Sequence, residues 1–126
     1  MKQQIDTPKA PAAVGPFSQG IRSAGTLYVS GQLPIDPATG ELCAGDIADC
    51  ARQSLRNLAA VVEAAGATLD DVLKVTVFLT DMADFAAVNA VYAEFFTAPF
   101  PARSAFAVAG LPLGARVEAE AIVSLP

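Results

Sequence analysis

At 126 residues the chain has the length of one domain, and we expect that domain to span residues 1–126. The hydrophobic fraction is 53% and the charged fraction only 17%, so we expect apolar surface to be buried against other copies of the chain. A net charge of −5 without any Lys/Arg cluster excludes the usual nucleic-acid binder, and the absence of histidine removes the commonest general base and metal ligand.

The two cysteines and the N-terminal segment indicate a reducing compartment. Cys43 and Cys50 are seven positions apart, which matches no common metal-binding or redox spacing. Segment 1–6 lacks the apolar stretch of a signal peptide, and no apolar run is long enough to span a bilayer. We therefore predict a cytoplasmic protein with ordinary free thiols and no membrane association.

The first third of the chain predicts two strands and the loops around them. Residues 7–16 contain three prolines and favour an extended, ordered loop. Strands are predicted near residues 18–23 and 26–33, with a tight connection through Ala24-Gly25. Residues 36–41 favour a turn, because a proline near its start and a glycine near its end suit the backbone of a turn.

A helix is predicted from about Asp46 to Ala65. Asp46 can cap its first turn, and Gly66 stands where a helix-ending glycine is common. Six apolar residues recur at helical spacing and form one stripe: Ile47, Ala51, Leu55, Leu58, Val62 and Ala65.

A strand over residues 72–80 and a second helix over about residues 82–96 come next. The strand is rich in β-branched residues and should point Leu73, Val75, Val77 and Leu79 one way and Lys74, Thr76 and Phe78 the other. The apolar stripe of the helix is Phe85, Val88, Tyr92 and Phe95.

Two strands complete the chain. A short one is predicted to begin near Arg103, just past a proline, and a longer one alternates from Ala115 to Val123. One face of the longer strand holds Val117, Ala119, Ala121 and Val123, and the other holds Arg116, Glu118, Glu120 and Ile122.

The order β-β-α-β-α-β-β predicts an α/β (α+β) fold in which a single mixed β-sheet carries two helices on one face. The rows that face the helices should be Leu27/Val29, Val75/Val77 and Val117/Ala119/Ala121. The opposite face should hold Tyr28, Ser30, Gln32, Lys74, Thr76, Phe78, Glu118 and Glu120. No helix remains to cover that mixed face, so we expect another subunit to cover it.

Arg103 and Glu118 are charges within segments that otherwise favour buried strands. On neighbouring strands of one sheet face, a guanidinium and a carboxylate can bind a small anion and act on a water molecule beside it. The alternative is a structural Arg–Glu pair. A site with Arg103, Ser30 and Glu118 is expected at or near a subunit boundary.

Four segments give the chain a family likeness that covers essentially its whole length. They are PAAVGPFSQG at 11–20, VSGQLP at 29–34, FPARS at 100–104 and VEAEAI at 117–122. In this order and spacing the chain resembles the RidA/YjgF/UK114 family of reactive-intermediate deaminases. Each motif alone is weak, but together they are specific.

The resemblance implies a chorismate-mutase-like fold assembled as a homotrimer with three clefts between subunits. It also implies hydrolysis of 2-imino acids, such as 2-iminobutanoate and 2-iminopropanoate, to 2-oxo acids and ammonia. Neither a metal nor an organic cofactor is implied.

Matched by position, the resemblance assigns the reaction to two side chains. Arg103 would hold the substrate carboxylate through its planar fork, which lysine cannot copy. Glu118 would position or activate the water that attacks the imine carbon. The other residues assigned to the cleft are Phe17, Ser30, Gly31, Asn89 and Ala105, where Asn89 equally fits a structural hydrogen bond near a subunit boundary.

Two positions depart from the family pattern. Phe17 replaces the usual tyrosine and so lacks a phenolic hydroxyl, and Ala105 replaces a common cysteine, which leaves only its main-chain groups. Activity could therefore be full, reduced or redirected to another imine. The alternatives are a non-catalytic trimer that binds or senses small carboxylates and, less in keeping with the acidic composition, a ribonuclease or translation inhibitor.

Overall fold

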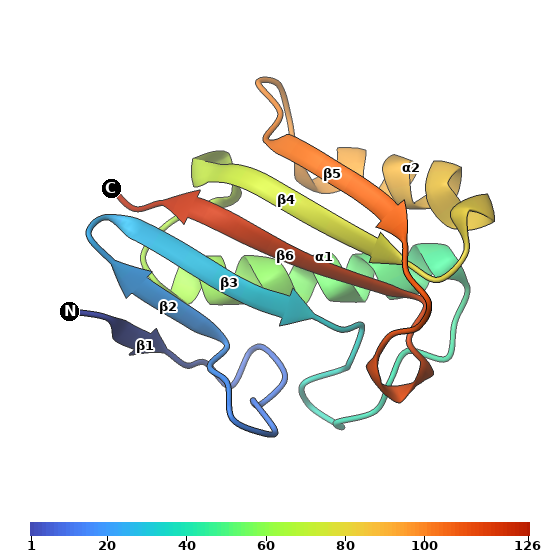
Figure 1. Ribbon diagram of the computed structural model, residues 1–126, viewed down its shortest axis with the longest axis horizontal. Coiled ribbons are helices and arrows are strands. Elements are labelled where there is room, and N and C mark those ends of the chain that lie inside the picture. Colours follow the sequence, from blue (N-terminus) through green and yellow to red (C-terminus); the bar gives the residue numbers. More distant parts are fainter.

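Six segments of alternating apolar and polar residues pair into one mixed sheet. The computed structural model describes residues 1–126 and places two helices behind this sheet (Figure 1). The strands are β1 (Gln3–Ile5), β2 (Gly20–Ser23), β3 (Thr26–Gln32), β4 (Val72–Leu79), β5 (Ala102–Ala107) and β6 (Val117–Ser124). They lie in the order β1-β2-β3-β6-β4-β5, and only β4 and β5 are parallel. The predicted fold class is confirmed.

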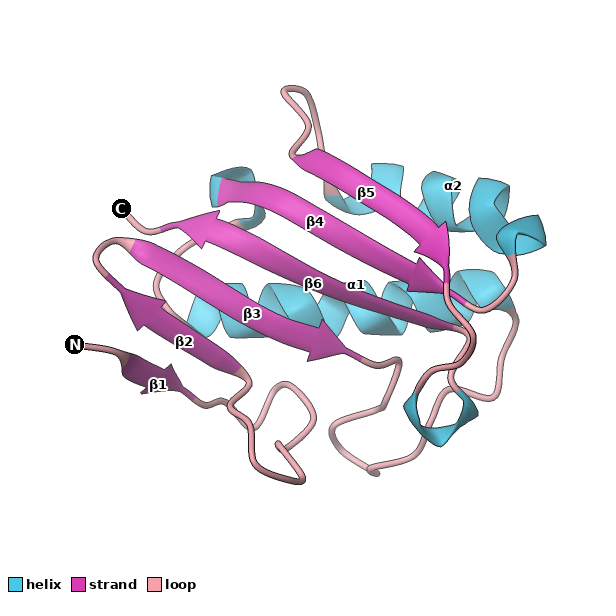
Figure 2. Cartoon of the chain, in the orientation of Figure 1, coloured by secondary structure: helices cyan, strands magenta, loops and turns pink.

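The helices α1 (Ile47–Ala64) and α2 (Phe85–Phe95) cover the same face of the sheet (Figure 2). Asp46 caps α1 by accepting a hydrogen bond from the backbone N–H of Asp49, and Gly66 follows the helix with a φ of +85°. The six-residue apolar stripe predicted for α1 is buried throughout. A short 3₁₀ turn, Met82–Asp84, precedes α2, so the second helix begins three residues later than predicted.

The core lies between the helices and one face of the sheet. The predicted helix-facing rows of β3, β4 and β6 are all buried, which confirms the alternation in these strands. The opposite face has no helix over it and points toward the reader in Figure 1. Its larger apolar side chains, Tyr28, Phe78, Phe106 and Ile122, remain partly or largely exposed.

Two β-bulges correct the predicted faces. The pairing register shifts between Val72 and Lys74, so Val72 is buried and Leu73, predicted to face the helices, is 54% exposed. A second shift between Val29 and Gln32 turns Gln32 into the core, away from the face predicted for it. The sequence reading also missed β1, a three-residue strand that pairs with β2. None of the helices is both long and apolar enough for a membrane span.

Candidate functional site

The bulge in β3 brings Gly31 against Glu118 of β6. Together with Ser30, the neighbour of Gly31 in the chain, we call these residues the Glu118 group. A Cβ atom added to Gly31 would lie 2.7 Å from both Cδ and Oε2 of Glu118, so the carboxyl group occupies the space that any other residue would need. Ser30 donates its hydroxyl to the carbonyl of Ser18 and its backbone N–H to that of Gln19.

Phe17 is presented at the same end of β3 by a fixed loop. The buried Gln19 side chain accepts a hydrogen bond from the Thr7 N–H at 2.7 Å and donates to the carbonyls of Thr7 and Pro11 at 3.0 and 2.8 Å. These bonds hold the segment before β2 in place. Ser18, whose carbonyl accepts the hydrogen bond from the Ser30 hydroxyl, follows Phe17 directly in the chain. Phe17 itself is about half exposed.

Glu118 is half-buried on the open face of the sheet, and its surroundings disfavour the ionised form. Burial raises the pKa of its carboxyl group, and the nearby carboxylate of Glu120 raises it further. A carboxylate with a raised pKa is a better proton acceptor, which is the property required of a group that activates water.

The second cluster, which we call the Arg103 group, lies where edge strand β5 meets α2. Arg103 Nη1 donates to Asn89 Oδ1 at 2.7 Å. The guanidinium carbon lies 4.8 Å from the ring centre of Tyr92 and 5.6 Å from that of Phe85. Two aromatic rings and one amide therefore orient a cation that stays exposed to solvent. The attraction between the cation and each ring is worth about 0.5–1 kcal/mol at an exposed site.

The sequence reading found Arg103 and Asn89 but assigned Phe85 and Tyr92 only to the apolar stripe of the helix. The helical spacing of residues 85, 89 and 92 could have indicated this group, since residues at i, i+4 and i+7 lie on one side of a helix. Tyr92 is 6% exposed, and its hydroxyl has no hydrogen-bond partner. Burial raises the pKa of this phenol, against a smaller opposing effect of the Arg103 charge.

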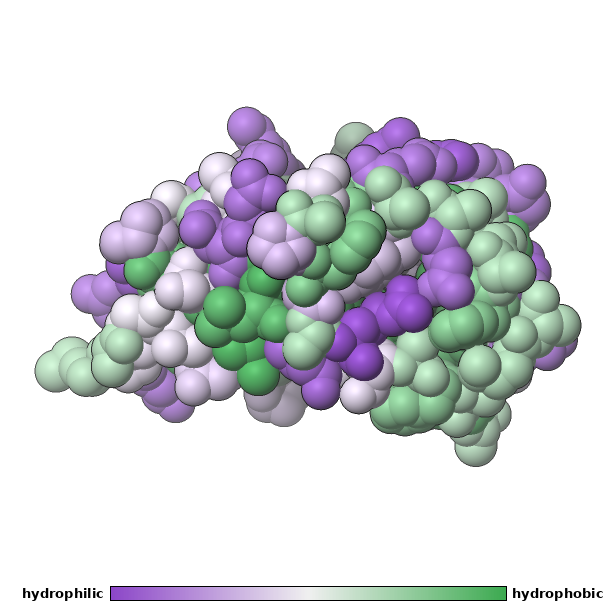
Figure 3. Space-filling model, turned by 90° about the horizontal axis from the view of Figure 1, so that it is seen from above, coloured by the Kyte–Doolittle hydropathy of each residue, from purple (hydrophilic) through white to green (hydrophobic).

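Ala105 lies two residues beyond Arg103 on the same side of β5. The register pairs Arg103 with Val75 and Ala105 with Val77, both of which are buried under the helices. Figure 3 views the molecule from above, from the side on which β5 and α2 lie in Figure 1, and shows hydrophilic surface between hydrophobic patches. The Arg103 group thus belongs to the helix side of the sheet edge.

The prediction that Arg103 and Glu118 share one sheet face on neighbouring strands is wrong within a single chain. Strand β4 separates β5 from β6, and Glu118 points to the open face while Arg103 points to the helix side. Three residues along the strands and two strand spacings separate their Cα atoms by about 14 Å. The alternative of a structural Arg103–Glu118 pair fails as well, because the observed partner of Arg103 is the amide of Asn89.

Comparison with known proteins identifies the family. Residues 7–125 match the family model described as Endoribonuclease L-PSP. The chain is 52% identical to RutC family protein y4sK of Sinorhizobium fredii, over 99% of each chain. It is 49% identical to 2-iminobutanoate/2-iminopropanoate deaminase of Capra hircus, over 97% of this chain and 89% of that protein.

A solved structure is similar to this chain in both fold and sequence. Escherichia coli TdcF with bound serine superimposes with a TM-score of 0.94 at 44% identity, covering 98% of this chain and 99% of that one. The near-complete family match and the full-length relatives agree in sequence and in structure: the chain belongs to the RidA/YjgF family.

Proposed function

We propose that the protein hydrolyses small 2-imino acids, such as 2-iminobutanoate and 2-iminopropanoate, to 2-oxo acids and ammonia. The observation that carries this proposal is the separation of two complementary half-sites on one chain. The Arg103 group offers an oriented, exposed cation, and the Glu118 group offers a half-buried carboxylate with a raised pKa. Relatives at 44–49% identity carry the name of this deaminase.

A second copy of the chain completes the cleft in this proposal. Within one chain the Cα atoms of Arg103 and Glu118 lie about 14 Å apart, and the two side chains point to opposite faces of the sheet, so a small imino acid does not bridge them. A homotrimer closed by head-to-tail contacts places the Arg103 group of each copy against the Glu118 group of the next and forms three such clefts. The uncovered sheet face around Tyr28 and Ile122 supplies apolar surface for these contacts.

The reaction divides between the two groups. Arg103 holds the substrate carboxylate through two N–H donors, with its guanidinium plane fixed by Asn89 and Tyr92. Glu118 accepts a proton from water as the water oxygen bonds to the carbon of the protonated imine. Glu118 then returns that proton to the nitrogen of the tetrahedral intermediate. As the C–N bond breaks, Glu118 takes up the proton of the new hydroxyl group and passes it to solvent, so that ammonia leaves and a 2-oxo acid remains.

Ammonia release from freshly generated imine tests the activity. Threonine dehydratase or an amino-acid oxidase supplies the imine in situ, and the purified chain should speed the appearance of ammonia above the spontaneous rate. No acceleration over a range of imines, with the trimer intact, would reject imine hydrolysis.

Mixing two inactive variants tests the shared cleft. Arg103→Lys and Glu118→Gln trimers, dissociated and reassembled together at equal amounts, should regain about a quarter of wild-type activity, because about one cleft in four then combines two intact half-sites. The Glu118→Gln trimer alone should lose about 100-fold or more. No recovery on mixing would show that each site lies within one chain.

Phe17 favours a second candidate function, in which the trimer binds or senses small carboxylates without turning them over. The missing hydroxyl removes a donor that the usual tyrosine would supply, and the Arg103 group is unaffected by that change. Tight binding of 2-oxobutanoate without any ammonia release would select this function. Recovery of turnover in Phe17→Tyr would assign the loss to the missing hydroxyl.

A further inference from the structure

The loop between β3 and α1, residues 33–46, is attached to α1 at its beginning by buried hydrogen bonds. Ser54 donates its hydroxyl to the carbonyl of Gln32 at 2.7 Å. Asn57 donates its side-chain amide to the carbonyls of Leu33 and Ile35 at 3.0 and 2.8 Å. Both side chains are buried, so this end of the loop is held firmly against the middle of the helix.

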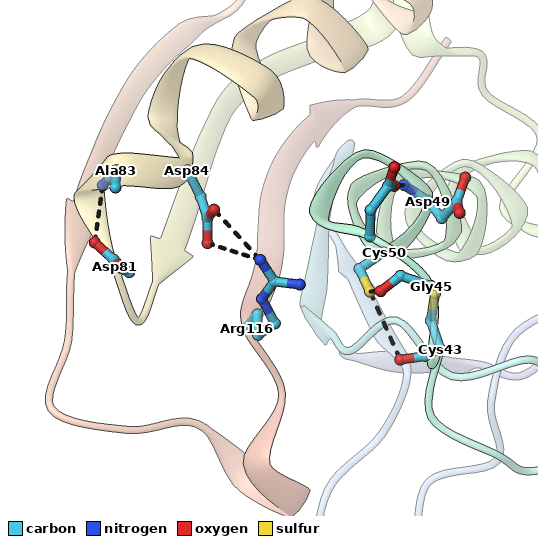
Figure 4. A network of polar contacts seen from close by, with 9 residues as sticks. Cys43, Gly45, Asp49, Cys50, Asp81, Ala83, Asp84 and Arg116 are labelled. Atoms are coloured by element: carbon cyan, nitrogen blue, oxygen red, sulfur yellow. Dashed lines mark hydrogen bonds and ion pairs between the residues drawn. The ribbon is translucent and has the colours of Figure 1, made fainter.

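The other end of the loop meets α1 through sulfur. Cys50, in the first turn of the helix, directs its Sγ toward the carbonyls of Cys43 and Gly45 at 3.6 and 3.8 Å (Figure 4). The seven-residue spacing matched no motif in the sequence, yet the fold packs the Cys50 sulfur against the backbone of Cys43.

The two thiols differ in their exposure. Cys50 is 3% exposed, whereas Cys43 is half-buried and open to small solutes. Burial, followed by the neighbouring Cys43, raises the pKa of Cys50 to about 12. The positive charge of Arg116, whose guanidinium donates to the Asp84 carboxylate in Figure 4, acts in the opposite direction. Cys43 is therefore the thiol that a dissolved oxidant reaches first, and Cys50 is the buried thiol that can react with oxidised Cys43.

We infer that Cys43 and Cys50 form a redox-active dithiol that closes to an intrachain disulfide when the protein meets a peroxide. The Cys43 thiolate attacks one peroxide oxygen, the O–O bond breaks, and hydroxide leaves a sulfenic acid on Cys43. The Cys50 sulfur then attacks the Cys43 sulfur, the S–O bond breaks, and the Cys50 proton departs with the oxygen as water. Two thiols and one hydrogen peroxide thus yield one disulfide and two waters, and a dithiol reductant reverses the change.

The bond would fasten the loop to α1 at a second point. Neither cysteine belongs to the Arg103 or Glu118 group, so this inference stands or falls independently of imine hydrolysis. The closed loop is short, and the crosslink should raise the melting temperature by roughly 5–10 °C if the native geometry accepts it.

Intact-mass measurement after mild hydrogen peroxide treatment of the folded protein tests the dithiol. The wild-type chain should lose about 2 Da, regain it with dithiothreitol, and yield a Cys43–Cys50 crosslinked peptide on digestion. Gain of oxygen on Cys43 without a crosslink, a crosslink between chains, or no change at all would each overturn the inference.

Two single variants serve as matched controls. In Cys50→Ser, Cys43 has lost its partner and should gain about 16 or 32 Da as sulfenic or sulfinic acid under the same treatment. In Cys43→Ser, the buried Cys50 should stay unmodified. Neither variant should show the peroxide-induced rise in melting temperature. Equal oxidation of Cys43 in the wild type and in Cys50→Ser would mean that Cys50 does not resolve the sulfenic acid.

Discussion

The Glu118 group and the Arg103 group each hold one charge, but they hold it in opposite ways. Glu118 is half-buried against a glycine beside a second carboxylate, and these surroundings raise its pKa. Arg103 is exposed, and two aromatic rings and an amide orient it without a countercharge. The first setting suits proton transfer, and the second suits capture of a charged ligand from water. The following substitutions alter one half-site at a time.

The largest effect is expected from Arg103→Lys. Lysine keeps the charge but loses the planar fork, so the proposed imine hydrolysis should fall roughly 30- to 1000-fold while the proposed trimer persists. Arg52→Lys is a matched control, because Arg52 makes a two-pronged contact with Glu94 on the protein surface. It should leave turnover within about twofold. Steady-state kinetics and thermal unfolding of both variants provide the comparison; similar kinetic losses in both would remove the special role of Arg103.

Gly31→Ala changes the Glu118 group by adding one methyl group, without altering any charge. The new methyl group would overlap the Glu118 carboxyl, which can swing away at little expense because it is the end of a flexible side chain. The free energy of unfolding should change by less than about 1 kcal/mol, while kcat should fall roughly 10- to 100-fold as the carboxylate moves. Gly110→Ala meets no atom within 4 Å and controls for the added methyl. A Gly31→Ala enzyme of normal kcat would show that the carboxylate position is not critical.

Tyr92 tests the aromatic support of Arg103. Tyr92→Leu removes the closer of the two ring contacts, so KM for the imine and Kd for 2-oxobutanoate should both rise about tenfold, more than kcat falls. Tyr92→Phe keeps the ring and discards an unpartnered buried hydroxyl, so binding should be unchanged and stability equal or higher. Calorimetric titration with 2-oxobutanoate measures the binding. If Tyr92→Leu binds as tightly as the wild type, the ring does not orient the guanidinium.

The smallest change is expected from Glu120→Gln. In the proposed mechanism Glu118 acts in its ionised form, so activity should fall as the pH drops through the raised pKa of that carboxyl group. Removing the neighbouring charge lowers that pKa and should move the acidic limb of the kcat/KM profile to lower pH, with the plateau within about twofold. Glu63→Gln, an exposed carboxylate on α1, should leave the limb unmoved. An unchanged limb in Glu120→Gln would mean that another group controls it.

Local signals in the sequence sufficed for most of the fold. The cap at Asp46, the six-residue stripe and Gly66 predict α1 to within one residue at each end, because these signals act within a few residues of the helix. Alternation likewise predicts which residues of β3, β4 and β6 face the helices. It fails at Leu73 and Gln32, where a bulge inserts one residue and reverses the faces beyond it.

The candidate site depended on information that no local pattern contains. The sequence by itself singled out Arg103 and Glu118 as candidates for the chemistry, and its alternation predicted that Glu118 faces away from the helices. Only the tertiary structure decided that β4 lies between their strands, that the two side chains lie on opposite faces, and that the Cys50 sulfur packs against Cys43. Side-chain alternation is a property of one strand, whereas strand order and the packing of a loop on a helix arise from the burial of all elements together.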